Sequence, residues 1–88
     1  MKNILLFILR ECPHCKRALT YINELQAENP EYRTIDMKII DEKEEKALAD
    51  SYDYYYVPTF YIDDIKIKEG VLTKEDIRDV FDKALLNV

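Results

Sequence analysis

The chain contains, at residues 4–15, the stretch ILLFILRECPHC. A continuous apolar run, Ile4–Leu9, is followed after two charged residues by Cys12 and Cys15, with two residues between the cysteines. Such a run is typical of a strand that is covered on both faces. From Pro13 onward apolar residues recur every three or four positions, and proline suits a first helical turn because its missing N–H has no partner there. This stretch predicts a central strand that leads into a helix, with Cys12 at the helix N-terminus.

The two thiols at this junction indicate redox chemistry. Unpaired N–H groups and the dipole at a helix N-terminus favour a thiolate. An ordinary cysteine is only about 3% ionised at pH 7, so a lowered pKa makes a thiol much more nucleophilic. We expect Cys12 to attack and Cys15, one turn into the helix on its apolar stripe, to resolve. Pro13 and His14, which lie between them, are expected to tune the thiol pKa values, His14 through its imidazole.

The middle of the chain predicts a second strand and a second helix. The first helix should end near Asn29, because the residue before a proline avoids helical angles. Alternation of apolar and polar residues predicts a strand over 32–40. Asp41, with Glu44 three residues later, resembles a capping box that opens a short helix reaching Tyr52.

The last third of the chain predicts a hairpin followed by a helix. Residues 59–63 have the pattern of a third strand, and a turn at Asp63-Asp64 joins it to a lysine-rich edge strand at 65–68. Thr73, with Asp76 three residues later, predicts the N-cap of a final helix. The resulting order is βαβαββα, which implies a four-stranded mixed sheet flanked by three helices.

Composition and charge limit the class of protein. With 88 residues, 48% of them hydrophobic and 35% charged, the chain is expected to form one globular domain, residues 1–88. The net charge of -5 gives no reason to bind nucleic acid. The apolar run 4–9 is too short for a signal-peptide core, and no segment approaches the roughly 18 apolar residues of a membrane span. We therefore expect a cytoplasmic protein with no membrane partner, in which a lone cysteine pair serves redox chemistry or metal binding.

Three features together resemble the thioredoxin superfamily in its small, glutaredoxin-sized form. They are the Cys-Pro-His-Cys dithiol at the strand-to-helix turn, Val57-Pro58-Thr59 at the entry to the third strand, and the order βαβαββα. The resemblance implies an α/β, thioredoxin-like fold over the whole chain. It also implies a cis proline at Pro58 that faces the dithiol and exposes the backbone of Val57 to an extended substrate. At least one of Tyr55 and Tyr56, which precede this segment, is expected to offer a flat apolar surface, and Tyr56 to Thr59 form the predicted substrate-binding segment.

The expected activity is that of a thiol–disulfide oxidoreductase. The enzyme should reduce or exchange protein disulfides through a mixed disulfide on Cys12, with a redox-active Cys12–Cys15 disulfide and no other cofactor. The expected partners are proteins that contain disulfides and a reductase that donates electrons. A dithiol with a potential of about −120 mV would stay reduced in a cytosol poised near about −280 mV, so net reduction is expected.

Three alternatives use the same thiols. Glutathione-linked glutaredoxin activity is one, but Gly70 stands alone where that family has a Gly-Gly pair, and His14 replaces its tyrosine, so weak glutathione binding is expected. A metal-binding module would use Cys12, Cys15 and His14, whereas structural zinc takes four ligands. A redox switch without turnover would need the same low-pKa thiol and resolving neighbour, and the sequence leaves it open.

Overall fold

The computed structural model describes residues 3–86 and has the predicted order βαβαββα. Its strands are β1 (Ile4–Ile8), β2 (Met37–Asp41), β3 (Thr59–Ile62) and β4 (Ile65–Glu69). Its helices are α1 (Pro13–Glu28), α2 (Lys46–Asp50) and α3 (Lys74–Leu85). The strands form one sheet in the order β2-β1-β3-β4, in which β1 and β2 are parallel and the other pairs antiparallel. The predicted α/β fold, with a central first strand and a lysine-rich edge strand, is confirmed.

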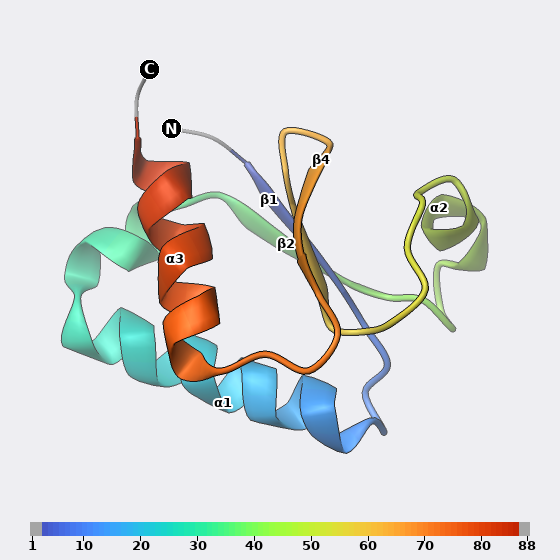
Figure 1. The fold of residues 1–88 in the computed structure, drawn as a ribbon, viewed down its shortest axis with the longest axis horizontal. Helices are drawn as coiled ribbons and strands as arrows, with labels where there is room; N and C mark the ends of the chain where they lie inside the picture. The colour runs from blue at the N-terminus through green and yellow to red at the C-terminus, as the bar shows by residue number, and fades with distance from the viewer. Residues whose placement is uncertain (1–2, 87–88) are drawn as a thin grey trace.

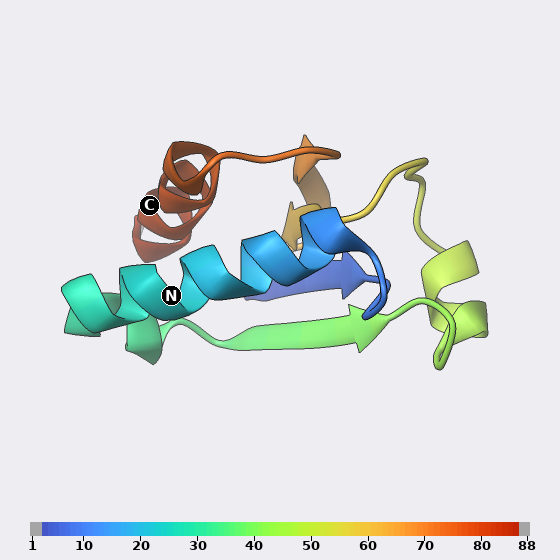
Figure 2. The same cartoon turned by 90° about the horizontal axis from the view of Figure 1, so that it is seen from below.

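The three helices lie in two places relative to the sheet. Helices α1 and α3 lie side by side against the sheet, while α2 lies apart from them beyond the end of β2 (Figures 1 and 2). Within residues 3–86, no helix has the length and apolar character needed to cross a membrane.

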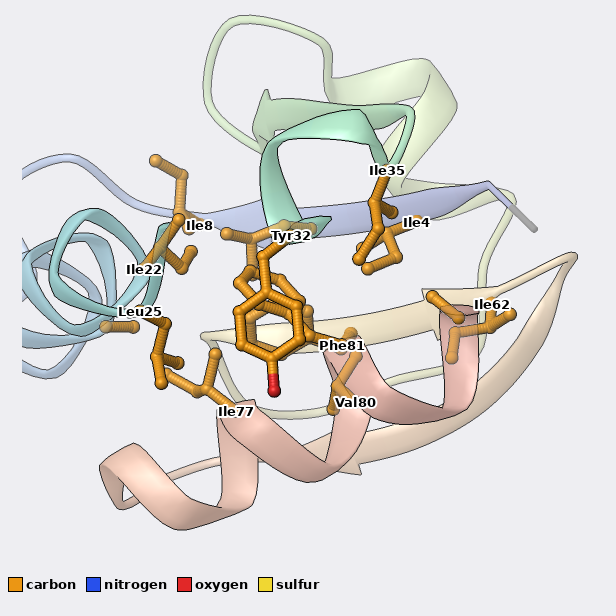
Figure 3. Packing of buried hydrophobic residues seen from close by; sticks show 14 of the residues in the cluster. Ile4, Ile8, Ile22, Leu25, Tyr32, Ile35, Ile62, Ile77, Val80 and Phe81 are labelled. Carbon is orange, nitrogen blue, oxygen red and sulfur yellow. The ribbon is translucent and has the colours of Figure 1, made fainter. Parts of the chain in front are cut away.

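The main core fills the space between the sheet and helices α1 and α3 (Figure 3). Ile4 and Ile8 of β1 face this core, and Phe81 of α3 is 1% exposed. The Phe81 ring lies 5.2 Å from the ring of Tyr32. A smaller cluster covers the other face of the sheet, where four buried side chains pack together: Phe7, Ile40, Ala49 and Tyr61.

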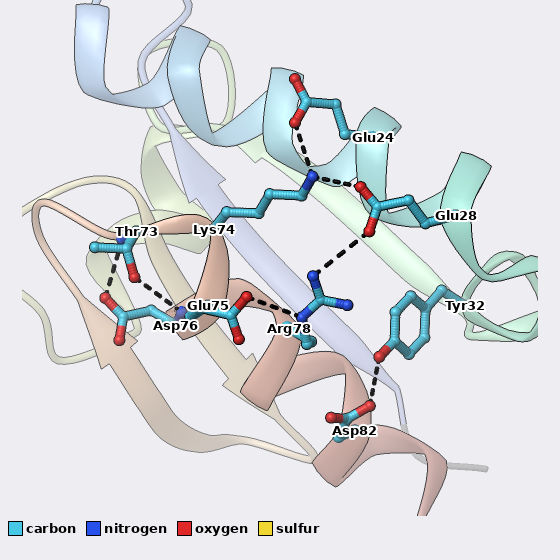
Figure 4. Close-up of polar contacts among 9 residues, drawn as sticks. All are labelled: Glu24, Glu28, Tyr32, Thr73, Lys74, Glu75, Asp76, Arg78 and Asp82. Carbon is cyan, nitrogen blue, oxygen red and sulfur yellow. Dashed lines mark hydrogen bonds and ion pairs between the residues drawn. The ribbon is translucent and has the colours of Figure 1, made fainter.

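Polar contacts join α1 to α3 outside this core (Figure 4). Lys74 lies 3.1 Å from Glu24 and 2.5 Å from Glu28. The predicted cap of α3 is confirmed as a capping box, because the Thr73 hydroxyl accepts the Asp76 N–H and the Asp76 carboxylate accepts the Thr73 N–H. These contacts fix the start of α3 against the C-terminal part of α1.

The second strand is shorter than predicted. Residues 30–34 form a 3₁₀ helix, and β2 begins only at Met37. The cause is Tyr32, which is buried in the main core and donates a hydrogen bond of 2.5 Å to Asp82, fifty residues away. Ile40, which the alternation did not explain, is buried in the smaller cluster on the opposite face.

The predicted capping box of Asp41 and Glu44 is wrong. Parallel pairing of Ile8 with Asp41 extends β2 through Asp41, so this residue ends a strand and does not open a helix. Helix α2 begins at Lys46 and ends at Asp50, before Tyr52.

The hairpin turn between β3 and β4 is confirmed. Asp63 and Asp64 have φ values of 48° and 68°, the left-handed conformation that two-residue hairpin turns require. Asp63 therefore belongs to the turn and β3 ends one residue earlier than predicted, at Ile62, while β4 continues to Glu69.

Candidate active site

Cys12 is the N-cap residue of α1, with Pro13 in the first helical turn. Its backbone is fixed on both sides, because its N–H donates to the Leu9 carbonyl at 3.0 Å and its own carbonyl accepts the Lys16 N–H at 3.0 Å. The thiol makes no capping hydrogen bond, yet the N–H groups at the helix start are near enough to stabilise a thiolate. The N–H of Cys15 first, and that of His14 after it, lower the pKa of Cys12 below its ordinary value.

Cys15 is placed very differently. Its side chain is 0% exposed and packs into the main core, where the sulfur accepts the Leu9 N–H at 3.4 Å. Burial raises the pKa of Cys15 to about 12, and the negative charges of a Cys12 thiolate and of Glu42 act in the same direction. Both cysteines are free thiols in the structure. The arrangement therefore presents one half-exposed thiol of lowered pKa beside one buried, protonated thiol.

The predicted substrate-binding segment follows the loop after α2 and ends at Thr59, the first residue of β3. The Val57–Pro58 peptide bond is cis, and Pro58 and Thr59 are buried. The Thr59 hydroxyl donates to the Tyr56 carbonyl, while Tyr56 itself is 69% exposed. Val57 packs against the same main core as Cys12.

A hollow of about 350 Å³ brings together residues that are distant in the sequence. It is lined by His14, Tyr56, Val57, Gly70 and Val71. The structure therefore joins the dithiol turn to two of the predicted substrate-binding residues in one largely apolar surface. A second hollow, of about 560 Å³, reaches Cys12 from the loops that follow β1 and β2.

The predicted role of His14 needs a more exact description. His14 is exposed, and the group of this residue that lowers the pKa of Cys12 is its backbone N–H, whereas the sequence pointed to the imidazole. Tyr54, beside the predicted segment, packs its ring on Phe7 at 5.0 Å and donates to Glu42 at 3.0 Å, so it belongs to the smaller cluster.

Asp41 contributes to the site in a way that sequence reasoning missed. Its buried carboxylate accepts the Arg10 N–H at 3.2 Å and the Lys43 N–H at 2.8 Å, and the Arg10 guanidinium lies 3.8 Å away. It thereby ties the loop that carries Cys12 to the end of β2. The sequence held a signal for this contact, because the carboxyl ends of adjacent parallel strands meet at one edge of a sheet and Asp41 ends the second strand.

The described residues offer no ready metal centre. Across residues 3–86, no group of three or more His, Cys, Asp and Glu side chains is arranged to hold a metal ion. The two thiols therefore have no third ligand of these types beside them within this range.

Comparisons with known proteins agree with this geometry. The structure is similar to that of a malarial protein, with 19% identity, a TM-score of 0.74 and coverage of 98% of this chain and 99% of that chain. It is similar to a mutant thioredoxin from Halobacterium salinarum, with 21% identity, a TM-score of 0.71 and coverage of 99% and 77%. It is also similar to oxidised thioredoxin from Plasmodium falciparum, with 18% identity, a TM-score of 0.72 and coverage of 97% and 82%.

A comparison with curated proteins finds no match. The family model of the thioredoxin domain, however, matches residues 2–82, which is most of the chain. The four-stranded mixed sheet, the three helices and the dithiol at the start of α1 agree with that match. The chain therefore belongs to the thioredoxin family.

Proposed function

We propose that this protein reduces or exchanges protein disulfides, with Cys12 as the nucleophile and Cys15 as the resolving thiol. Membership of the thioredoxin family supports thiol–disulfide oxidoreductase chemistry in general. The observation that carries the specific proposal is the contrast between the two thiols, one half-exposed with a lowered pKa and one buried with a raised pKa.

The reaction proceeds in two exchange steps. The Cys12 thiolate attacks one sulfur of the substrate disulfide, the substrate S–S bond breaks, and the departing sulfur takes up a proton. Cys15 then loses its proton and attacks the Cys12 sulfur of the mixed disulfide, which releases the second substrate thiol. Two electrons pass from the dithiol to the substrate, and the protein is left with a Cys12–Cys15 disulfide.

An extended peptide is the form of substrate that suits this surface. Within residues 3–86, neither the N–H nor the carbonyl of Val57 has a hydrogen-bond partner, so both are free to pair with a substrate strand. Tyr56 and Val71, both well exposed, line the adjoining hollow and offer apolar surface to a side chain next to the substrate cysteine.

The proposed direction is net reduction in the cytosol, with a separate reductase as electron donor and glutathione as a weak ligand at most. A dithiol in equilibrium with a glutathione pool at about −280 mV is predominantly reduced unless its own potential is still lower. Refolding of a scrambled disulfide protein in glutathione buffer tests this direction, because a reductase or exchanger removes or shuffles wrong disulfides. Dominant net formation of disulfides by this protein would contradict it.

Reduction of insulin by dithiothreitol tests the enzymatic role of the thiols. Wild type should accelerate the reaction and Cys12→Ser should abolish the acceleration. Incubated with insulin in the absence of dithiothreitol, Cys15→Ser should accumulate a mixed disulfide with the substrate, because the attacking thiol remains while the resolving thiol is gone. The double variant is the matched control for general folding. Full activity in Cys12→Ser would remove the proposal.

A further inference from the structure

The last residue of β4, Glu69, holds a segment of chain that is distant from it in the sequence. Its Oε2 accepts the backbone N–H of Tyr55 and, at 2.9 Å, that of Tyr56. Its Oε1 accepts a hydrogen bond of 2.9 Å from Lys66, and only 19% of the Glu69 side chain is exposed. Both carboxylate oxygens are therefore committed to contacts within the protein.

The residue that follows Glu69 holds the other end of the same segment. Gly70, at φ 93°, donates its N–H to the Pro58 carbonyl at 2.9 Å. Glu69 itself lies opposite Thr59 in the antiparallel pairing of β3 with β4. The end of β4 thus clamps residues 55–58 on both sides of Val57.

Besides the Thr59 hydroxyl, which donates to the Tyr56 carbonyl, little else fixes the start of this segment. Residues 55 and 56 lie outside regular secondary structure and are 83% and 69% exposed, so packing contributes little to holding them. Hydrogen bonds to a carboxylate are about twice as strong as those between neutral groups. The carboxylate is consequently the main constraint on the backbone that leads into the predicted substrate-binding segment.

We propose that Glu69 is a positioning residue that keeps Tyr56 and Val57 in the conformation that receives an extended disulfide substrate. This role rests on the proposed function, because it concerns the surface beside the Cys12 thiol. Glu69 touches neither thiol in the structure and is not among the groups that shift the pKa of Cys12. Its loss should therefore weaken substrate engagement and leave the reactivity of the thiol as it is.

The test compares Glu69→Ala and Glu69→Gln with wild type in steady-state insulin reduction. The matched control is Glu75→Ala, since Glu75 also pairs with a cation three residues away, on the exposed face of α3. Glu69→Ala should raise KM about tenfold with kcat little changed. A tenfold rise is expected if only about a tenth of the free molecules hold the binding conformation. Glu69→Gln should have an intermediate KM, because its amide oxygen still accepts N–H bonds, and Glu75→Ala should match wild type.

Two further measurements separate positioning from a general loss of stability. Amide hydrogen exchange at Tyr55 and Tyr56 should accelerate about tenfold or more in Glu69→Ala, with exchange in β1 unchanged. The pH dependence of Cys12 alkylation should stay that of wild type.

An unchanged KM, or unchanged exchange at Tyr55 and Tyr56, would overturn the role of Glu69. A shifted Cys12 titration would also overturn it, because the residue would then act on the thiol. A wild type that reduces no disulfide overturns the proposed function and this role with it. Normal wild-type reduction with an unchanged KM in Glu69→Ala overturns only the role.

Discussion

The two thiols should differ by orders of magnitude in their reactivity toward an alkylating reagent. Raising the pKa of Cys15 from an ordinary 9.0 to about 12 lowers its thiolate fraction at pH 7 by about a thousandfold. The pKa of Cys12 is lowered, so its thiolate fraction exceeds that of an ordinary cysteine. At pH 7, the reduced protein should therefore be modified at Cys12 alone.

The assay is alkylation of the reduced protein by iodoacetamide from pH 5 to 11, read by mass spectrometry of the two cysteine positions. Single Cys→Ser variants assign each titration to one thiol without coupling between them. Protein unfolded in urea is the control, since both thiols should then titrate alike, near the value of a free cysteine.

A third variant tests the physical cause of the asymmetry. The leading cause of the lowered pKa of Cys12 is the backbone N–H of Cys15, and the Cys15 thiol contributes less. Cys15→Ala keeps that N–H, and His14→Ala keeps the N–H of residue 14, so both variants should retain a lowered pKa at Cys12. A return of Cys12 to the free value in Cys15→Ala, or equal titration of both thiols in the folded wild type, would refute the reasoning.

Three further results are expected. As the pH rises from about 9 toward 12, the unfolded chain loses the Cys15 proton before the folded protein does, so the free energy of unfolding of the reduced protein should fall in this window. Urea unfolding should show a smaller fall for Cys15→Ala. Phe81→Ala should cost about 3–5 kcal/mol of unfolding free energy, because the ring is buried against Tyr32; a loss below about 1 kcal/mol would contradict this packing. Thr73→Ala should cost about 1 kcal/mol by removing the hydroxyl that caps Asp76, whereas Thr73→Ser should restore most of it.

Features that depend on neighbours in the sequence were predictable. The start of α1 at Pro13 follows from a proline at a first helical turn, and its end before Pro30 from the restriction that proline places on the preceding residue. The capping box of Thr73 and the hairpin turn at Asp63 and Asp64 are equally local. Each of these is a contact between residues one to four positions apart, so the pattern itself contains both partners.

Features that depend on distant partners were mispredicted or missed. The segment around Tyr32 reads as a strand by alternation, but its hydroxyl bonds to Asp82 and its ring enters the core, which favours the 3₁₀ turn. Asp41 looks like a helix cap until the pairing of β2 with β1 gives its carboxylate the Arg10 N–H. Propensity is a weak prior where a tertiary contact competes with it.

The sequence by itself determined the order of the elements, the place of the dithiol at the first turn of α1, and which thiol would lie on the buried stripe. Local periodicity and turn chemistry suffice for these, because they act within a few residues along the chain. Only the tertiary structure decided how strongly the thiols differ, since the burial of Cys15 comes from the core between the sheet and helices α1 and α3. The clamp of Glu69 on residues 55 and 56 was likewise decided there, because sheet pairing brings β4 beside a loop more than ten residues earlier in the chain.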